Sequence, residues 1–153
     1  MSVVQASTVI DAPPKLVWKV VANPRNLPRW NRHVAAVRGV PPEGLHEGLS
    51  YETDLRFMGV RGMARAHVAE LRPPRYARIR VSGPLSAIVE TWVEPLDGER
   101  SRLAHRVRFR FIGGPLGRLA ERAIQRLGAP SILRRGVLAQ KQQVEEEVRR
   151  RAG

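Results

Sequence analysis

The stretch that decides the fold is RLAHRVRFRFIGGPLGRLAERAIQRL, residues 102–127. In its first half, apolar residues and His105 alternate with arginines and one alanine. This alternation predicts a β-strand with one apolar and one solvated face. The segment 113–115 (Gly-Gly-Pro) breaks the strand, and from Leu116 onward apolar residues recur every three or four positions. The chain is therefore expected to pass here from a sheet into an amphipathic C-terminal helix.

The alternation of apolar and polar residues, with its period of two, extends upstream through the middle of the chain. Turns rich in Pro and Gly separate its segments, and no helical pattern lies between them, which is typical of an antiparallel meander. The predicted strands cover residues 34–40, 49–58, 60–71, 76–82, 85–95 and 102–112.

The two ends of the chain complete the order of elements. Residues 3–10 alternate as a strand does, and two short helices are expected after them, the first from Pro14 and the second over 25–31. The C-terminal helical pattern runs on to Val148, with an interruption or kink at 128–130. A sheet with one apolar face needs a cover, and only this C-terminal helix is long enough. We expect an α+β fold, a curved antiparallel sheet of about seven strands around a long C-terminal helix.

The length and the lack of cysteine limit the classes of protein. A chain of 153 residues fits one domain, so residues 1–153 are expected to form a single unit. The absence of cysteine excludes disulfide scaffolds, zinc ribbons, iron–sulfur sites and thiol nucleophiles. The start does not have the pattern of a secretory signal, and no apolar run reaches the roughly 18 residues of a membrane span. We therefore expect a cytoplasmic protein.

The charge is strongly basic, with a formal net value of +13, and it is uneven along the chain. Residues 1–99 hold 13 basic and 10 acidic residues, whereas 100–153 hold 14 basic and 4 acidic. Such an imbalance suits an anionic partner such as a membrane surface, a nucleic acid or an acidic protein. The alternative is a solvated basic surface with no dedicated partner, and the excess of arginine over lysine fits that interpretation as well.

Recognised motifs of catalysis and cofactor binding do not occur in the chain. It contains no phosphate-binding or dinucleotide-binding glycine pattern, no zinc-protease helix motif and no serine-hydrolase elbow. The glycines of residues 113–117 are interpreted as a joint between strand and helix. The four histidines lack the spacing of metal ligands. We expect neither a metal nor a cofactor.

Several local motifs accompany this order of elements: Ile10-Asp11-Ala12-Pro13-Pro14, Val17-Trp18, Asn23-Pro24, Leu27-Pro28, Trp30, Gly48, residues 68–74 and Gly83-Pro84-Leu85. Over nearly the whole chain they resemble the START/Bet v 1-like superfamily, and within it the bacterial polyketide cyclase/dehydrase and lipid transport family. The resemblance implies a helix-grip fold with a hydrophobic pocket between sheet and helix. Members include lipid carriers, quinone-binding proteins, aromatic polyketide cyclases and ribosome-associated factors.

Three polar residues are candidates for chemistry in such a pocket. His105 shares the apolar phase of its strand, so its ring could exchange a proton with a ligand carbonyl or phenol, or it could be a satisfied core histidine. Tyr51 could offer its phenol, or it could be core. Glu70 shares the phase of Ala64 and Ala66, which predicts an inward carboxylate, although it could also be a solvated residue at the rim. Where this chain has Ala64, Ala66 and Glu70, the aromatic cyclases that it resembles carry tryptophans and an arginine.

The expected function is to bind a small hydrophobic molecule, such as a lipid, an isoprenoid quinone or a polyketide. One alternative is a polyketide cyclase/dehydratase that uses His105, Tyr51 and Glu70. The other is a basic interaction module for a ribosome, a nucleic acid or an anionic membrane, built on the arginines of the outer sheet face, which lack the exposed aromatics typical of nucleic-acid binding. The residues expected to contact the ligand are Trp30, Tyr51, Leu55, Phe57, Ala64, Ala66, His105, Val107, Phe109 and Leu119.

Overall fold

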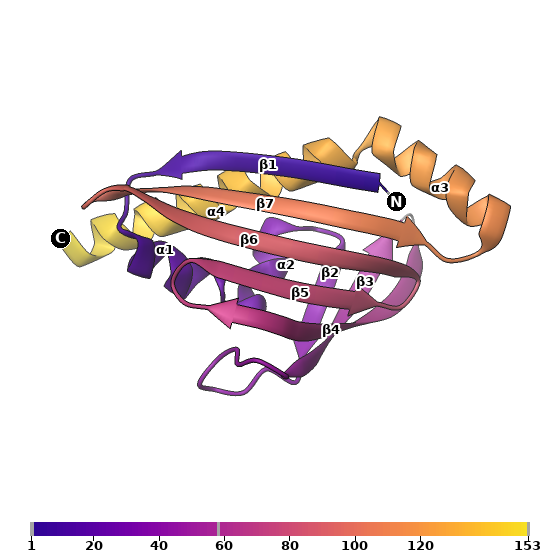
Figure 1. The fold of residues 1–153 in the computed structure, drawn as a ribbon, viewed down its shortest axis with the longest axis horizontal. Helices are drawn as coiled ribbons and strands as arrows, with labels where there is room; N and C mark the ends of the chain where they lie inside the picture. Colours follow the sequence, from indigo (N-terminus) through magenta and orange to yellow (C-terminus); the bar gives the residue numbers. More distant parts are fainter. Residues whose placement is uncertain (1, 58, 153) are drawn as a thin grey trace.

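The structure, a computed structural model, describes residues 2–57 and 59–152. Its strands form one antiparallel sheet in the order β1-β7-β6-β5-β4-β3-β2 (Figure 1). The strands are β1 (Ser2–Ile10), β2 (Val34–Arg38), β3 (Ser50–Phe57), β4 (Val60–Arg72), β5 (Tyr76–Ser82), β6 (Leu85–Asp97) and β7 (Arg100–Phe111). The helices are α1 (Pro14–Val21), the 3₁₀ turn η1 (Pro24–Asn26), α2 (Leu27–Trp30), α3 (Gly114–Leu127) and α4 (Ala129–Ala152).

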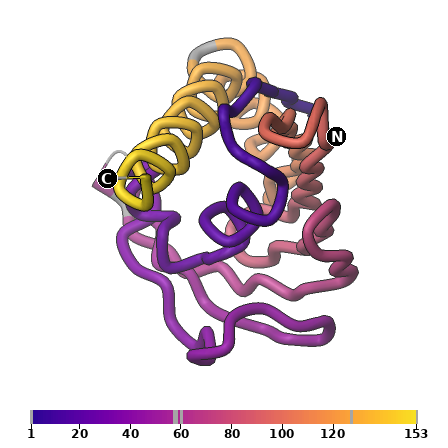
Figure 2. The backbone as a smooth tube through the Cα atoms, turned by 90° about the vertical axis from the view of Figure 1, so that its left-hand side faces the viewer, coloured from indigo at the N-terminus to yellow at the C-terminus, as the bar shows by residue number. Residues whose placement is uncertain are grey.

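The predicted α+β helix-grip class is confirmed, and most strand limits agree with the prediction to within about two residues. The alternation in β7 has the expected consequence, since Leu103 and Phe109 are buried while Arg102 and Arg110 are exposed. The sheet curves so that its inner face turns toward the helices (Figure 2).

The long helix α4 packs mainly along the edge strand β1, with α1 and α2 beside it. Its inward side carries Val137 and Val144, seven residues apart and fully buried, with Gln140 between them. The two valines pack into a cluster with Ile10 and Leu103, which joins the helix to β1 and β7. Because α4 follows one edge of the sheet, it does not cover the middle strands as it covers β1.

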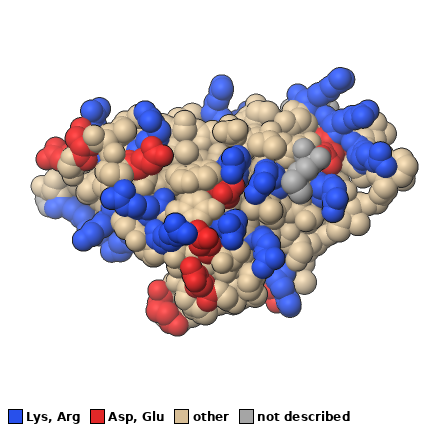
Figure 3. Space-filling view, in the orientation of Figure 1, with Lys and Arg blue, Asp and Glu red and all other residues tan. Residues whose placement is uncertain are grey.

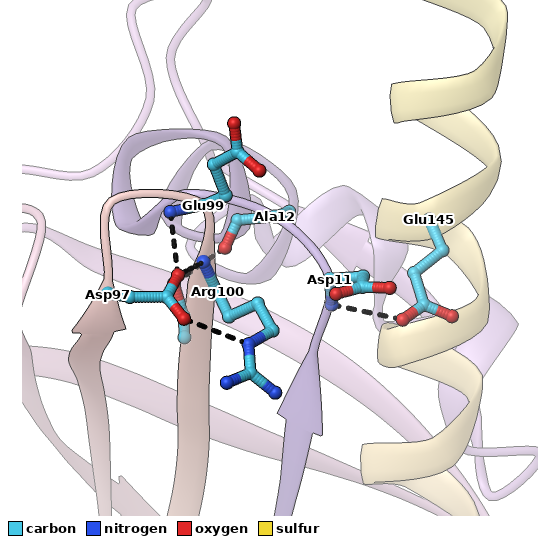
Figure 4. A network of polar contacts seen from close by, with 7 residues as sticks. Asp11, Ala12, Asp97, Glu99, Arg100 and Glu145 are labelled. Atoms are coloured by element: carbon cyan, nitrogen blue, oxygen red, sulfur yellow. Dashed lines mark hydrogen bonds and ion pairs between the residues drawn. The ribbon is translucent and has the colours of Figure 1, made fainter.

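Polar contacts fix the end of the sheet where α4, α1 and the β6–β7 turn meet (Figure 4). Glu145 of α4 accepts a hydrogen bond from the backbone N–H of Asp11 at 3.0 Å. Asp97 accepts from the backbone N–H groups of Glu99 and Arg100, both at 2.9 Å, and so closes the turn. At the free edge of β1, Lys141 donates to the carbonyl of Val9 at 2.8 Å. The Lys141 bond satisfies a backbone carbonyl that the edge strand β1 would otherwise leave open.

The C-terminal helical pattern is divided between two helices rather than forming one continuous cover. α3 ends at Leu127, the N–H of the following Gly128 donates to the carbonyl of Ile124 at 3.0 Å, and α4 then begins in a new direction (Figure 1). Pro130 lies in the first turn of α4, where its missing N–H costs nothing. The prediction that Leu119 lines an internal pocket is therefore wrong, because this side chain is 64% exposed on α3.

A β-bulge in β4 reverses the expected orientation of Glu70. Val68 pairs with Ile79 and Glu70 with Arg78, so Ala69 is an extra residue in the strand. One extra residue moves all later side chains to the opposite face. The prediction of an inward Glu70 is therefore wrong: its carboxylate lies on the outer face, 3.2 Å from Arg72 Nε and 3.8 Å from Arg78 Nη2.

Candidate functional site

The inner surface of the sheet, called here the concave face, holds most of the residues that the sequence singles out. Directly opposed residues of neighbouring strands share a face, so the register places Phe109, Ala87, Val81, Ala66 and Tyr51 in one row across five strands. The next rows hold Val107, with Val89 and Ile79, and His105, with Thr91 and Ala77. Ala64 and Leu55 lie in the same phase on β4 and β3. The side chain of Phe57 lies outside the described part of the structure.

Apolar side chains on the concave face remain partly exposed. Those at the two ends pack into separate clusters, one around Val137 and Leu103 and one around Phe109. Several aliphatic side chains of β3, β5, β6 and β7 on this face are only half-buried, although Val81 and Val107 pack against the Phe109 cluster and Ile79 against a third cluster around Tyr51. The half-buried side chains are Leu55, Ile79, Val81, Val89 and Val107. The cause is the position of α4, which packs along β1 and leaves this part of the concave face accessible.

His105 sits at the centre of a buried polar contact between the sheet and α4. Its Nε2 lies 2.7 Å from Gln140 Oε1, and its Nδ1 lies 2.9 Å from Thr91 Oγ1. Because the amide oxygen accepts, the ring proton resides on Nε2 and the threonine hydroxyl donates to Nδ1. Burial lowers the pKa of His105, and the hydrogen bond with Gln140 opposes this only in part. His105 is thus a neutral ring with both nitrogens occupied.

Trp30 makes a similar contact one turn further along α4. Its indole N–H donates to Gln143 Oε1 at 2.8 Å, and its ring is buried in the same cluster as Val137 and Val144. Trp30 therefore stands at the boundary between α2 and α4.

Tyr51 differs from His105 in having a phenol that forms no hydrogen bond to any described residue. Its ring is buried with Ala66 and Val68, and burial raises the pKa of its hydroxyl to about 12. Tyr51 remains protonated at neutral pH and can donate to a ligand. Its strand β3 lies four strands from β7, about 19 Å across the sheet, and Tyr51 shares the row of Phe109, four residues along β7 from His105.

The outer face of the sheet carries a polar cluster that the sequence reasoning missed. Glu90 is 6% exposed and accepts from Tyr76 Oη at 2.7 Å and from Arg106 Nη2 at 2.6 Å. Arg106 also lies 5.3 Å from the centre of the Trp92 ring, and Arg108 lies 3.7 Å from Glu90. Burial acts to raise the pKa of Glu90, but the hydrogen bonds and charges of its partners outweigh it and lower the pKa. The predicted row of free arginines is thus partly neutralised.

Two cavities of the described chain lie away from His105. One, of about 480 Å³, borders Tyr76 and Trp92 near the β4–β5 turn. The other, of about 230 Å³, borders Arg38, Tyr51 and Arg65. Among the described residues, no group of three or more His, Asp or Glu side chains could hold a metal ion, and no helix is long and apolar enough to cross a membrane.

Gln140 and Gln143 are functional candidates that sequence reasoning also missed. A signal for Gln140 was present, because this polar residue lies midway between Val137 and Val144 in the apolar stripe of α4. A polar residue on a buried helix face needs a partner, and here the partner is a histidine 35 residues earlier.

The comparisons with known proteins agree with this geometry. The family model described as "Polyketide cyclase / dehydrase and lipid transport" matches residues 1–145. This chain belongs to that family. No curated protein sequence matches the chain.

Solved structures of similar fold cover nearly the whole chain at low identity. The Zhui aromatase/cyclase from Streptomyces sp. R1128 is 17% identical, with a TM-score of 0.74 over 96% of this chain and 95% of that one. A protein from Thermus thermophilus is 16% identical, with a TM-score of 0.74 over 95% and 99%. A START superfamily protein from Mycobacterium smegmatis is 14% identical, with a TM-score of 0.66 over 94% and 97%. At these identities the similarity establishes the fold.

Proposed function

We propose that this protein binds a small hydrophobic molecule, such as a lipid, an isoprenoid quinone or a polyketide, on the concave face beside α4. The observation that carries the proposal is the set of half-buried aliphatic side chains there, which are Leu55, Ile79, Val81, Val89 and Val107. Water-exposed apolar surface inside a curved sheet gains about 25 cal/mol for each Å² that a ligand covers, before the entropy costs of binding. The family assignment supports the same class of ligand.

A polar group of the ligand is expected to meet Tyr51. Its phenol is protonated and free of partners among the described residues, so it can donate one hydrogen bond at no cost to the fold. His105 is tied to Thr91 and Gln140, and it contributes mainly by holding α4 at the edge of the binding face.

The test compares two isoleucines on opposite faces of adjacent strands. Ile79 is half-buried on the concave face of β5, and Ile88 is half-buried on the outer face of β6. The purified protein is analysed by native mass spectrometry, and bound molecules are extracted into organic solvent and identified. Ile79→Trp should fill the binding face and remove the co-purifying molecule, whereas Ile88→Trp should retain it.

Two results would contradict the proposal. One is that both tryptophan variants carry the co-purifying molecule to the same extent. The other is a wild-type protein that carries no apolar molecule and is not stabilised by a panel of lipids, quinones and polyketides.

A second candidate is a polyketide cyclase/dehydratase acting on the same face. It is favoured by the similarity to the Zhui aromatase/cyclase and by a neutral His105, which suits a general base. It ranks second because Tyr51 lies four strands and four residues away from His105 in the sheet, too far for both to act on one bond, and because Glu70 points away. Unchanged product formation by His105→Gln would exclude catalysis by this residue.

A further inference from the structure

Helix α3 presents an apolar face to solvent. Leu116 is 77% exposed and Leu119 is 64% exposed, and Ala120 and Ala123 continue the stripe at helical spacing. Ile112, at the end of β7, lies just before this helix and is 68% exposed. We call these five residues the α3 apolar face. Contiguous exposed apolar surface of this kind marks an interaction site more often than scattered single residues do.

The orientation of α3 is held by contacts on its opposite side. Ile124 packs into the cluster around Phe109, and Gln125 donates to the backbone carbonyl of Val3 at 3.1 Å. Gly117 approaches β7 so closely that a Cβ there would lie 3.0 Å from the carbonyl oxygen of Phe111. These contacts keep the α3 apolar face pointing outward, so its exposure is a property of the packed fold.

A row of arginines flanks the α3 apolar face. Arg118, Arg122 and Arg126 follow one another every four residues, and all three are exposed. None of them forms an ion pair with any described carboxylate. The single acid of the helix, Glu121, is turned inward and accepts from Ser2 Oγ at 2.6 Å. Figure 3 shows basic side chains gathered at this end of the molecule.

We infer that α3 docks the protein on an anionic lipid bilayer, with the α3 apolar face inserted among the acyl chains and the three arginines on the headgroup phosphates. An exposed leucine stripe beside a cationic flank is the composition of helices that lie in the plane of a membrane interface. A second copy of the chain fits less well, because docking two such faces would bring their arginines together. A nucleic acid would satisfy the arginines but leave the leucines uncovered. This inference holds whether or not the concave face binds a ligand.

The experiment measures co-sedimentation of the full chain with vesicles of phosphatidylcholine alone or mixed with phosphatidylglycerol. We expect binding to the anionic vesicles, weakened by added salt, and little binding to phosphatidylcholine alone. The double variant Leu116→Ser/Leu119→Ser should reduce the apparent affinity by about tenfold or more. Because both leucines are mostly exposed, this variant should keep its thermal unfolding temperature.

Two double variants separate the contribution of the α3 arginines to vesicle binding from that of the protein's overall positive charge. Arg122→Gln/Arg126→Gln and Arg149→Gln/Arg150→Gln remove the same two charges, the first from α3 and the second from the far end of α4. Only the α3 pair should weaken binding strongly. Leu138→Ser, at a half-exposed leucine on α4, should have little effect.

Any of four outcomes with the vesicles or with the protein alone would overturn the inference. They are equal loss from both arginine pairs, full binding by the double serine variant, equal binding to the two kinds of vesicle, and a dimer in solution that the double serine variant abolishes. Tight binding of RNA that competes with the vesicles and survives the serine substitutions would also overturn it, in favour of a purely electrostatic surface.

Discussion

His105 of β7 and Gln140 of α4 are joined by a 2.7 Å contact between Nε2 and Oε1, in a position buried for both residues. It is a buried polar link between the sheet and the long helix, whereas the Lys141–Val9 bond joins the two at the exposed edge. A buried donor without its acceptor costs more than the bond itself contributes. The contact therefore adds to the apolar packing of Val137 and Val144 in holding α4 against the sheet.

Removing the acceptor should destabilise the fold. Gln140→Leu leaves the Nε2–H of His105 without a partner, and we expect a loss of about 1–3 kcal/mol in the free energy of unfolding. Urea denaturation measures it, with Gln142→Leu on the exposed side of the same helix as control. The double variant His105→Leu/Gln140→Leu should recover part of this lost stability. If Gln140→Leu and Gln142→Leu lower the free energy of unfolding equally, the contact does not stabilise the fold.

Stability should depend on pH through His105. Burial lowers its folded pKa below the value of 6.5, so the unfolded chain takes up the proton first as the pH falls. The free energy of unfolding should therefore decrease as the pH drops below about 6.5 and level off past the folded pKa. Denaturation of wild type and His105→Gln over this range should show a difference that shrinks with falling pH; a constant difference would contradict the pKa assignment.

The outer-face cluster around Glu90 should produce a second decrease in the free energy of unfolding, at lower pH than that of His105. Hydrogen bonds from Tyr76 and Arg106 overcome the effect of burial and lower the pKa of Glu90 below 4.5, so its contribution is present above that pH and is lost as the pH falls through the folded pKa. Glu90→Gln should lower the free energy of unfolding by about 1–3 kcal/mol at neutral pH. The loss should stay in this range because Arg106, left without its carboxylate partner, is only partly buried. Glu94→Gln, exposed on the same strand and face, is the control, and equal stability of both variants would refute this role.

Ligand affinity should depend on the Tyr51 phenol. Tyr51→Phe removes one donor from the concave face, and a ligand with a carbonyl or headgroup oxygen should bind about 2–10 times more weakly. Titration of the extracted ligand into delipidated protein measures the change. Tyr76→Phe, on the outer face, removes the same atom and should leave the affinity as it is. An equal loss of ligand affinity in both variants would mean that the substitutions act through the stability of the protein and not through a contact with the ligand.

Much of the fold could be predicted from the sequence because its periodicities are local. The alternation of Leu103, Val107 and Phe109 with arginines indicates a strand with one solvated face, whatever its position in the sheet. The order of elements then restricts the architecture to a sheet covered by a C-terminal helix. Of the candidate site, the concave-face positions of Tyr51, His105 and Val107 follow from the same alternation.

The errors arise where a single residue changes the geometry. Ala69 forms a bulge that no local pattern reveals, and it carries Glu70 to the outer face. Gly128 lets α3 and α4 take different directions, and as a result Leu119 faces solvent. Hydrophobic spacing says which side chains share a face, but it does not say whether that face is covered.

The sequence by itself determined the strands, the helices, their order and the apolar side of each, because these follow from the repeat of the backbone and the preference of apolar groups for burial. Only the tertiary structure decided that α4 follows β1 and leaves the middle strands half-open, that Gln140 meets His105, and that α3 turns its leucines outward. Those features depend on which faces meet across long separations in the chain, and the contacts that select them exist only once the sheet has curved and the helices have packed.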